Sequence, residues 1–191
     1  MAAVSKNGCA LMFVPEDLRS NPDLCMAAVS SDGHALAHVP NDLRSNQDLY
    51  MALCVAAVRN KGRALSDVPE ELRPTNRALC LSAVRQDGWA LGYLPKQFLD
   101  DPQFCLAAVS RAGRAFQYVP APLRSNRDIC LAALRQDVRA SSQLPDAVRD
   151  DRRFWLEAIN QIGLRLEDVA WKFQDDPEIR AAAAKQSRQR G

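Results

Sequence analysis

The sequence predicts an all-α fold, an α-solenoid of about seven helix–turn–helix repeats of 25 residues, and three observations support this prediction. A Val-Pro or Leu-Pro step recurs at intervals of 25, 29, 26, 25 and 25 residues. A glycine stands seven residues before most of these prolines, and an Asn or Asp follows each proline by six or seven residues. No segment shows the sustained alternation of apolar and polar residues that is typical of β-strands. Stacked two-helix units bury their apolar faces only against neighbouring units.

Each repeat is expected to begin with an amphipathic helix. Apolar residues occur in it at i, i+1, i+4 and i+5, as in Leu24, Cys25, Ala28 and Val29, which forms one broad apolar face. Its N-cap is an Asn or Asp whose side-chain oxygen can accept the N–H groups of the first turn, namely Asn21, Asn46, Asn76, Asp101, Asn126, Asp151 and Asp176. One alanine does not vary among the copies and predicts close approach of neighbouring helices: Ala3, Ala28, Ala57, Ala83, Ala108, Ala133 and Ala158.

The end of this helix and the segment after it are expected to be short and bent. A glycine in the left-handed conformation should end the helix. The following pattern, Ala-Leu-x-x-Val-Pro-x-x-Leu, predicts a short helix, a bend and another short turn, because proline disfavours the α conformation in the residue before it. The repeat around Leu53 and Cys54 carries four additional residues, close to one helical turn. Its first helix should therefore be one turn longer than the others.

These repeats are expected to form a single array over residues 1–185, followed by a basic C-terminal tail at 186–191. One copy reads NPDLCMAAVSSDGHALAHVPNDLRS, residues 21–45. The units end near the recurring steps, at Pro15, Pro40, Pro69, Pro95, Pro120, Pro145 and, in a degenerate seventh copy, Ala170. Because the units nearly fill the 191 residues, we expect no separate catalytic domain.

The repeats resemble the short α-helical repeat family named domain of unknown function 4116. The resemblance rests on LCMAAVSSDGHALAHVPNDLRSN and its in-phase copies, and it covers Met1 to about Ala184. It implies a helical fold found in intracellular bacteria, sometimes in candidate host-directed effectors, and in many protists. It implies no reaction and no catalytic residues. The copy at 135–145 departs from the pattern, with Val138 in place of glycine and Ser141 in place of leucine.

Charge and hydropathy exclude several classes of function. The chain has 25 basic and 23 acidic side chains and a net charge of +2, which argues against a charge-driven nucleic-acid binder. Hydrophobic residues make up 47% of the chain, enough for a buried core. No apolar run reaches the roughly 18 residues that a membrane span needs. We therefore expect neither a membrane nor a nucleic acid as a partner.

The cysteines favour a structural role over a metal site. They contain no C-x-x-C pair, which argues against a zinc finger. Copies of one repeat position should lie farther apart than a disulfide allows. We expect buried, unpaired thiols at this position, and therefore an intracellular, reducing compartment. The family resemblance implies in addition that the protein is delivered into a host cell. The five equivalent cysteines are Cys25, Cys54, Cys80, Cys105 and Cys130.

No pattern in the sequence indicates catalysis. His34 and His38 are the only histidines, and their i, i+4 spacing is found in metal-binding helices. Ala35 stands where a metalloprotease has glutamate, although Asp42 could complete a site. We favour a solvated pair, and we expect no metal and no cofactor. Because phosphate-binding, zinc-protease and serine-nucleophile motifs do not occur, we expect no catalytic residues and no enzyme activity.

A periodic row of arginines follows the Val-Pro steps. Arginine side chains can hold phosphates or acidic partner side chains through paired donors. The alternative that we favour is structural, with the guanidinium groups covering carbonyl groups at helix ends. The row consists of Arg19, Arg44, Arg73, Arg124 and Arg149, and Leu99 interrupts it.

Two positions of the second segment vary in size and charge while the core positions stay fixed. The first follows the glycine: Cys9, His34, Arg63, Trp89, Arg114, Arg139 and Leu164. The second comes four residues later: Phe13, His38, Asp67, Tyr93, Tyr118, Gln143 and Asp168. On an α-helix the two would share one face, and solenoids present binding surfaces in this way. We expect partner binding at Trp89, Tyr93, Arg114, Tyr118, His34, His38 and Arg63; alternatively, the aromatic rings only cover the next repeat's apolar edge.

The sequence thus predicts a non-catalytic protein–protein interaction module or scaffold whose partner it does not identify. Two alternatives stay open. One is a repeat segment of a larger host-directed effector, and the other is a nucleic-acid-binding solenoid, which needs stacking aromatics beside a continuous basic groove. The first repeat lacks most of its leading helix, so Ala3, Val4, Leu11 and Val14 should border an uncovered apolar surface. We expect self-association or fraying at this N-terminal edge.

Overall fold

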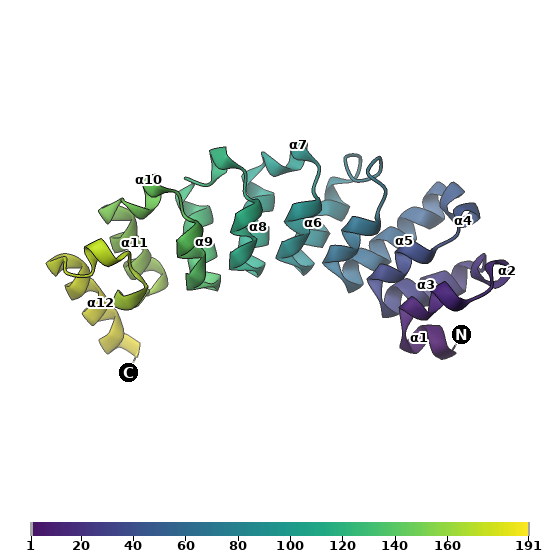
Figure 1. Ribbon diagram of the computed structural model, residues 1–191, viewed down its shortest axis with the longest axis horizontal. Helices are drawn as coiled ribbons and strands as arrows, with labels where there is room; N and C mark the ends of the chain where they lie inside the picture. Colours follow the sequence, from purple (N-terminus) through teal and green to yellow (C-terminus); the bar gives the residue numbers. More distant parts are fainter. Residues whose placement is uncertain (1, 191) are drawn as a thin grey trace.

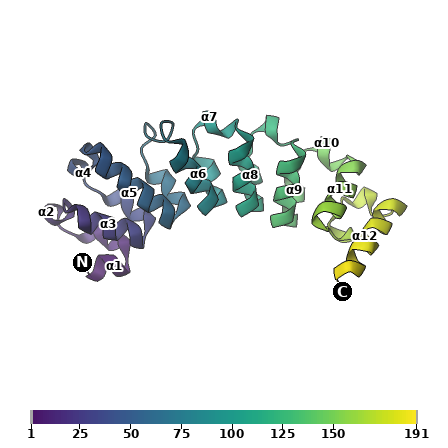
Figure 2. The same cartoon turned by 180° about the vertical axis from the view of Figure 1, so that it is seen from behind.

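The chain is all-α. The computed structural model describes residues 2–190, and no β-strand occurs among them. The helices follow one another along an arc, with the N- and C-termini at its opposite ends (Figure 1). Seen from behind, the short helices α7 and α10 lie along the outer edge of this arc (Figure 2).

The α-helices that open the units lie side by side in chain order, and each packs on the next. All but the first begin at the predicted N-caps, whose side chains accept hydrogen bonds from the first turn; Asn21 Oδ1, for example, accepts from Asp23 N at 2.9 Å. The helices are α1 Ala2–Lys6, α3 Pro22–Ser31, α5 Gln47–Asn60, α6 Arg77–Gln86, α8 Pro102–Arg111, α9 Arg127–Gln136, α11 Arg152–Ile162 and α12 Pro177–Arg190.

The second segment of each unit is a 3₁₀ helix, an extended Val-Pro or Leu-Pro step and a short turn. The step is extended because proline excludes the α conformation before it; Val39 has φ −66° and ψ 127°. The 3₁₀ helices are η1 Gly8–Phe13, η2 Gly33–His38, η3 Gly62–Asp67, η4 Gly88–Tyr93, η5 Gly113–Tyr118, η7 Val138–Gln143 and η8 Leu166–Asp168. The turns are α2 Glu16–Arg19, α4 Asn41–Ser45, α7 Lys96–Leu99, η6 Ala121–Leu123, α10 Asp146–Arg149 and η9 Trp171–Phe173.

The predicted additional helical turn is confirmed. Helix α5 has 14 residues, whereas α3 and α6 have 10. Its apolar positions Leu53, Cys54, Ala57 and Val58 are all fully buried, so the longer helix keeps the same face toward the core.

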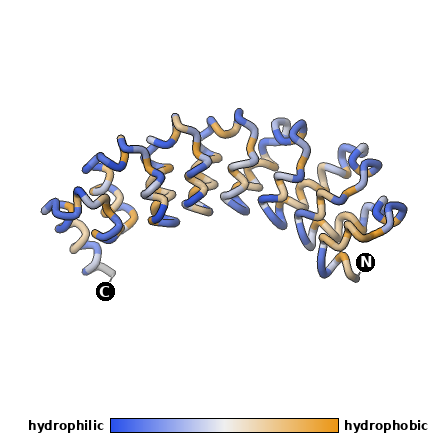
Figure 3. Tube along the Cα trace, in the orientation of Figure 1, coloured by the Kyte–Doolittle hydropathy of each residue, from blue (hydrophilic) through white to orange (hydrophobic). Residues whose placement is uncertain are grey.

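A continuous apolar core runs along the arc between the α-helices and the 3₁₀ helices. Apolar residues run through the middle of the array, and hydrophilic residues gather at the turns along both edges (Figure 3). The 3₁₀ helices contribute one large, fully buried side chain each in most units: Leu11, Leu36, Leu65, Leu91 and Phe116. Full burial of such a side chain stabilises the fold by about 1.5–3 kcal/mol.

The glycines do not end the helices in the predicted left-handed conformation, except at Gly163 with φ 67°. Elsewhere the residue before the glycine is extended and ends the helix. The glycine is needed because the next unit lies close to it. A Cβ added to Gly33 would lie 2.4 Å from Ala57 O, and one added to Gly88 would lie 2.2 Å from Ala108 O. The predicted close approach at the invariant alanine is therefore confirmed: the glycine of one unit lies against the carbonyl oxygen of the invariant alanine in the next unit.

The two ends of the array differ from its middle. Helix α1 is only five residues long, and Met1 lies outside the described residues. Helix α12 continues to Arg190, so residues 186–190 of the expected basic tail belong to this helix, and Gly191 lies outside the described residues. No helix within residues 2–190 is both long and apolar enough to cross a membrane.

Candidate functional site

The variable residues lie on 3₁₀ helices, so their side chains point in other directions than they would on an α-helix. A 3₁₀ helix has three residues per turn, so residues four apart point about 120° away from each other. The expectation that both variable positions share one helix face, which assumed an α-helix, is therefore wrong. Instead, the first position of one unit meets the second position of the next. His34 Nδ1 lies 2.7 Å from Asp67 Oδ2, and Trp89 contacts Tyr118.

Arg63, Trp89 and Tyr118 form one continuous group across three units, which we call the aromatic stack. The Arg63 guanidinium carbon lies 5.4 Å from the centre of the Trp89 ring, a cation–π contact. The Trp89 and Tyr118 rings meet edge to face, with centroids 6.0 Å apart. Asp87 holds Arg63 in place, because its Oδ2 accepts from Arg63 Nε at 2.8 Å. Gly92 leaves room for the Tyr118 ring, which a Cβ there would approach to 3.1 Å.

Large side chains of the aromatic stack and beside it remain open to solvent. Tyr118 is 42% exposed and Tyr93 is 40% exposed. Tyr93 lines a pocket of about 370 Å³ together with Arg73, Pro74 and Pro95. The stack therefore combines a cationic group, an indole and a phenol, and a second phenol, Tyr93, is exposed on the same 3₁₀ helix as Trp89.

The other predicted binding residues do not join the stack. His34 is occupied by its contact with Asp67. His38 is half-buried at the end of η2. Arg114 is exposed, and its charge helps to lower the pKa of Asp137, after the larger effect of the Arg139 hydrogen bond.

Three members of the arginine row hold the 3₁₀ helix of their own unit. Arg44 Nε donates to Val39 O at 2.8 Å and Arg44 Nη2 donates to Ala37 O at 3.0 Å. Arg73 and Arg124 make the same two contacts in their units. These carbonyl groups lie where the 3₁₀ helix ends and the chain becomes extended, so the guanidinium replaces helical hydrogen bonds that the bend removes.

The ends of the arginine row depart from this arrangement. Arg19 Nε is buried and has no hydrogen-bond partner within the described residues. The Arg149 guanidinium pairs with Asp146. In the last unit Gln174 stands at the arginine position, and its Nε2 donates to Val169 O at 2.9 Å.

The five equivalent cysteines are fully buried and unpaired, as predicted, and four of them also donate hydrogen bonds that the sequence did not indicate. Cys25 Sγ lies 3.1 Å from Arg19 O, and Cys130 Sγ lies 3.0 Å from Arg124 O. Burial raises the pKa of Cys105 to about 11 and that of Cys130 to about 12. These thiols are therefore poor nucleophiles at neutral pH. The spacing of six or seven residues between carbonyl and thiol is the signal that could have revealed the contact.

A second set of three arginines joins the first helix of a unit to the N-cap of the next. Arg77 Nη2 lies 2.6 Å from Asp101 Oδ2, and Arg127 pairs with Asp151. Arg152 Nε donates to Asp176 Oδ2 at 2.7 Å. The Arg152 hydrogen bond lowers the pKa of Asp176 to about 2. Each of these three arginines therefore has a carboxylate partner in the next unit.

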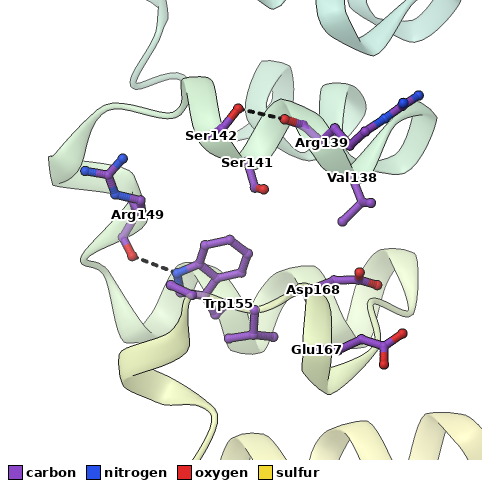
Figure 4. A pocket seen from close by; sticks show the side chains of 10 residues that line it. Val138, Arg139, Ser141, Ser142, Arg149, Trp155, Glu167 and Asp168 are labelled. Atoms are coloured by element: carbon purple, nitrogen blue, oxygen red, sulfur yellow. Dashed lines mark hydrogen bonds between the residues drawn. The ribbon is translucent and has the colours of Figure 1, made fainter.

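A pocket of about 310 Å³ opens between η7 and the segment after Gly163 (Figure 4). Its floor is the ring of Trp155, which is buried at the position where other units have cysteine. The Trp155 indole N–H donates to Arg149 O at 2.8 Å and so replaces the thiol contact of the other units. Sequence analysis located the departures Val138 and Ser141 that border this pocket, but it did not predict a pocket.

The N-terminal edge carries an apolar pocket of about 530 Å³. Val4, Val14, Leu18 and Leu24 line it, together with Phe13. Phe13 is 80% exposed and Leu18 is 56% exposed, whereas the equivalent Leu43 in the next unit is buried.

The fold and these surfaces define a class of all-helical proteins that consist of repeated units. Within residues 2–190, no group of three or more His, Cys, Asp and Glu side chains is placed to hold a metal ion. The profile of the family described as Domain of unknown function (DUF4116) matches residues 1–44, 76–124 and 101–149, more than half of the chain. The chain therefore belongs to this repeat family. No curated protein and no solved structure matches it.

Proposed function

We propose that the chain is a non-catalytic α-solenoid of about seven helix–turn–helix repeats over residues 1–185, and that it binds a protein partner across the aromatic stack. The in-phase repeats and the packing of each unit on the next support the solenoid. The buried, unpaired thiols support an intracellular, reducing compartment.

The aromatic stack is the observation that carries the proposed function. Most large apolar side chains of the array are buried, yet Tyr93 and Tyr118 remain exposed beside Trp89 and Arg63. Trp, Tyr and Arg dominate the energetic centres of protein interfaces, because they bury much area with little loss of conformational freedom. The contacts within the stack hold these side chains in place before a partner binds, which lowers the entropic cost of binding.

The charges favour a protein over a nucleic acid. A solenoid that binds single-stranded nucleic acid needs a continuous basic groove beside its aromatic rings. Here Arg63 is paired with Asp87, so the one cation of the stack carries its own counter-charge. The surface near the stack is therefore of mixed charge, as at many protein interfaces.

A matched pair of variants tests the proposed function. Trp89→Ala combined with Tyr93→Ala and Tyr118→Ala should lower recovery of a specific partner from native extract by tenfold or more, with unchanged helicity. The control is Leu106→Ala with Trp171→Ala, which removes exposed apolar side chains elsewhere and should leave recovery unchanged. Equal recovery with both variants would contradict the proposal.

The N-terminal edge supports self-association as a second property. Its pocket is lined mainly by apolar side chains, and Phe13 and Leu18 are exposed there. Two copies that meet through this edge would bury the patch in an isologous dimer. Sedimentation velocity should show a dimer whose population rises with concentration and falls in Leu18→Arg. A monomer at all concentrations would contradict this proposal.

A further inference from the structure

The pocket above Trp155 exists because one repeat lacks a core side chain. The position of Ser141 holds a fully buried leucine or phenylalanine in the five preceding units, for example Leu91 and Phe116. Ser141 is only partly buried, and its hydroxyl faces the pocket above the Trp155 ring (Figure 4). The array therefore leaves open a site that it fills elsewhere with a large apolar side chain.

Two backbone departures keep this site from closing. Val138 carries a Cβ where the regular units have glycine, so the next unit cannot approach as closely. Gly163 adopts the left-handed conformation and turns the following segment away. As a result, η3, η4, η5 and η7 pack on one another in order, whereas η8 does not continue this packing against η7.

The rim of the pocket is polar and carries charges of both signs. Arg139 stands on the η7 side, where its guanidinium pairs with Asp137, and Glu167 stands on the facing segment, where it pairs with Arg165; both are exposed. Val138, Val169 and the Trp155 ring provide apolar contact inside. The apolar interior suits an apolar side chain. The rim, which carries a positive and a negative group, suits the hydrogen-bond donors and acceptors of the peptide backbone to which that side chain is attached.

We propose that this pocket receives a leucine or phenylalanine side chain of a partner protein. The equivalent site in the regular units holds these two side chains, so their shape already fits the fold. The bound side chain lies on the Trp155 ring, and the flanking backbone lies between Arg139 and Glu167. This pocket shares no residue with the aromatic stack, so either proposal can fail without the other.

The test uses N-acetyl-phenylalaninamide and N-acetyl-leucinamide as probes and the indole N–H resonance of Trp155 as the readout. Both probes should produce a saturable shift of this resonance with a millimolar dissociation constant, and N-acetyl-glycinamide should produce none. Ser141→Leu should fill the pocket from within and weaken binding at least tenfold. Ser66→Leu is the matched control, because Ser66 follows the core residue of another unit as Ser142 does here, its hydroxyl donates to Arg63 O, and it lies outside this pocket; this variant should bind the probes as the unchanged protein does.

Several outcomes would overturn the proposal. One is that both probes shift resonances at the N-terminal pocket but not that of Trp155. Another is that Ser141→Leu binds the probes as tightly as Ser66→Leu. If Ser141→Leu loses helicity, Ser141→Met repeats the test with a more flexible side chain, and unchanged binding by that variant would also overturn it.

Discussion

The junction at Gly88 and the junction at Val138 are built from the same repeat but pack differently. At the first, the glycine lies so close to the next unit that an added Cβ would be 2.2 Å from Ala108 O. At the second, a valine occupies the glycine position and the core leucine is replaced by Ser141. The first junction is closed around Leu91, and the second contains a pocket of about 310 Å³.

This comparison shows that two residues per unit control whether neighbouring units close. The glycine sets how near the next helix can come, and the large residue three positions later fills the space that remains. Trp155 compensates in part at the open junction, because its ring fills more volume than the cysteine of other units and keeps the same backbone hydrogen bond. A binding site can thus arise inside a repeat array without any added segment.

The largest expected effect comes from exchanging the core residue between the two junctions. Phe116→Ser should lower the free energy of unfolding by about 4 kcal/mol, because it creates a cavity and buries a hydroxyl. Ser141→Phe should leave the free energy of unfolding unchanged or raise it, because the pocket at this junction can accommodate the larger side chain. Urea unfolding followed by circular dichroism measures the free energy of unfolding of both variants. A similar loss of stability in the two variants would contradict the comparison.

A smaller effect is expected at the cysteine position. Cys105 is fully buried, and its thiol lies 3.5 Å from Leu99 O. Cys105→Ser should lower the free energy of unfolding by about 1–3 kcal/mol, because burying a hydroxyl is less favourable than burying a thiol. Cys9→Ser is the control, because Cys9 is only partly buried and should change stability little. Thermal unfolding of both variants measures the difference, and an equal change in both would show that the periodic thiols do not belong to the core.

The smallest expected effect is on how stability changes with pH in the acidic range. The Arg152 hydrogen bond lowers the pKa of Asp176 in the folded protein to about 2, from an ordinary value of 3.8. A lowered pKa means that the stabilisation is present above the unfolded value and is lost as the pH falls from about 4 through about 2. Asp176→Asn should reduce the slope of stability against pH in this window. Asp146→Asn is the control at an exposed pair, and an identical slope for Asp176→Asn and the unchanged protein would contradict the assignment.

Much of the regular fold can be predicted from sequence spacing. The N-caps, the buried face of each first helix and the longer α5 follow from local chemistry, which the sequence displays directly. The role of the glycines does not, because glycine suits both a left-handed helix end and a close approach. Only the position of the neighbouring unit distinguishes these two uses, as Gly163 and Gly88 show.

The candidate sites are harder to predict than the fold. The variable positions point to Trp89 and Tyr118, but their pairing depends on the 3₁₀ geometry of η4 and η5, which apolar spacing alone does not separate from an α-helix. The Trp155 pocket depends on the left-handed Gly163, twenty-two residues after Ser141. Such a combination of distant departures becomes visible only once neighbouring units are placed.

Replacing Gly88 with alanine tests most directly the claim that close approach, and not helix ending, requires the glycines. Gly88 does not have a positive φ, so alanine is compatible with its backbone conformation. If close approach governs the site, the added Cβ must displace the Ala108 carbonyl, and Gly88→Ala should lower the free energy of unfolding by about 2 kcal/mol. Without a close neighbour, the same change would raise it by about 0.4–1 kcal/mol through the unfolded chain. A rise in stability measured by urea unfolding would therefore contradict the account.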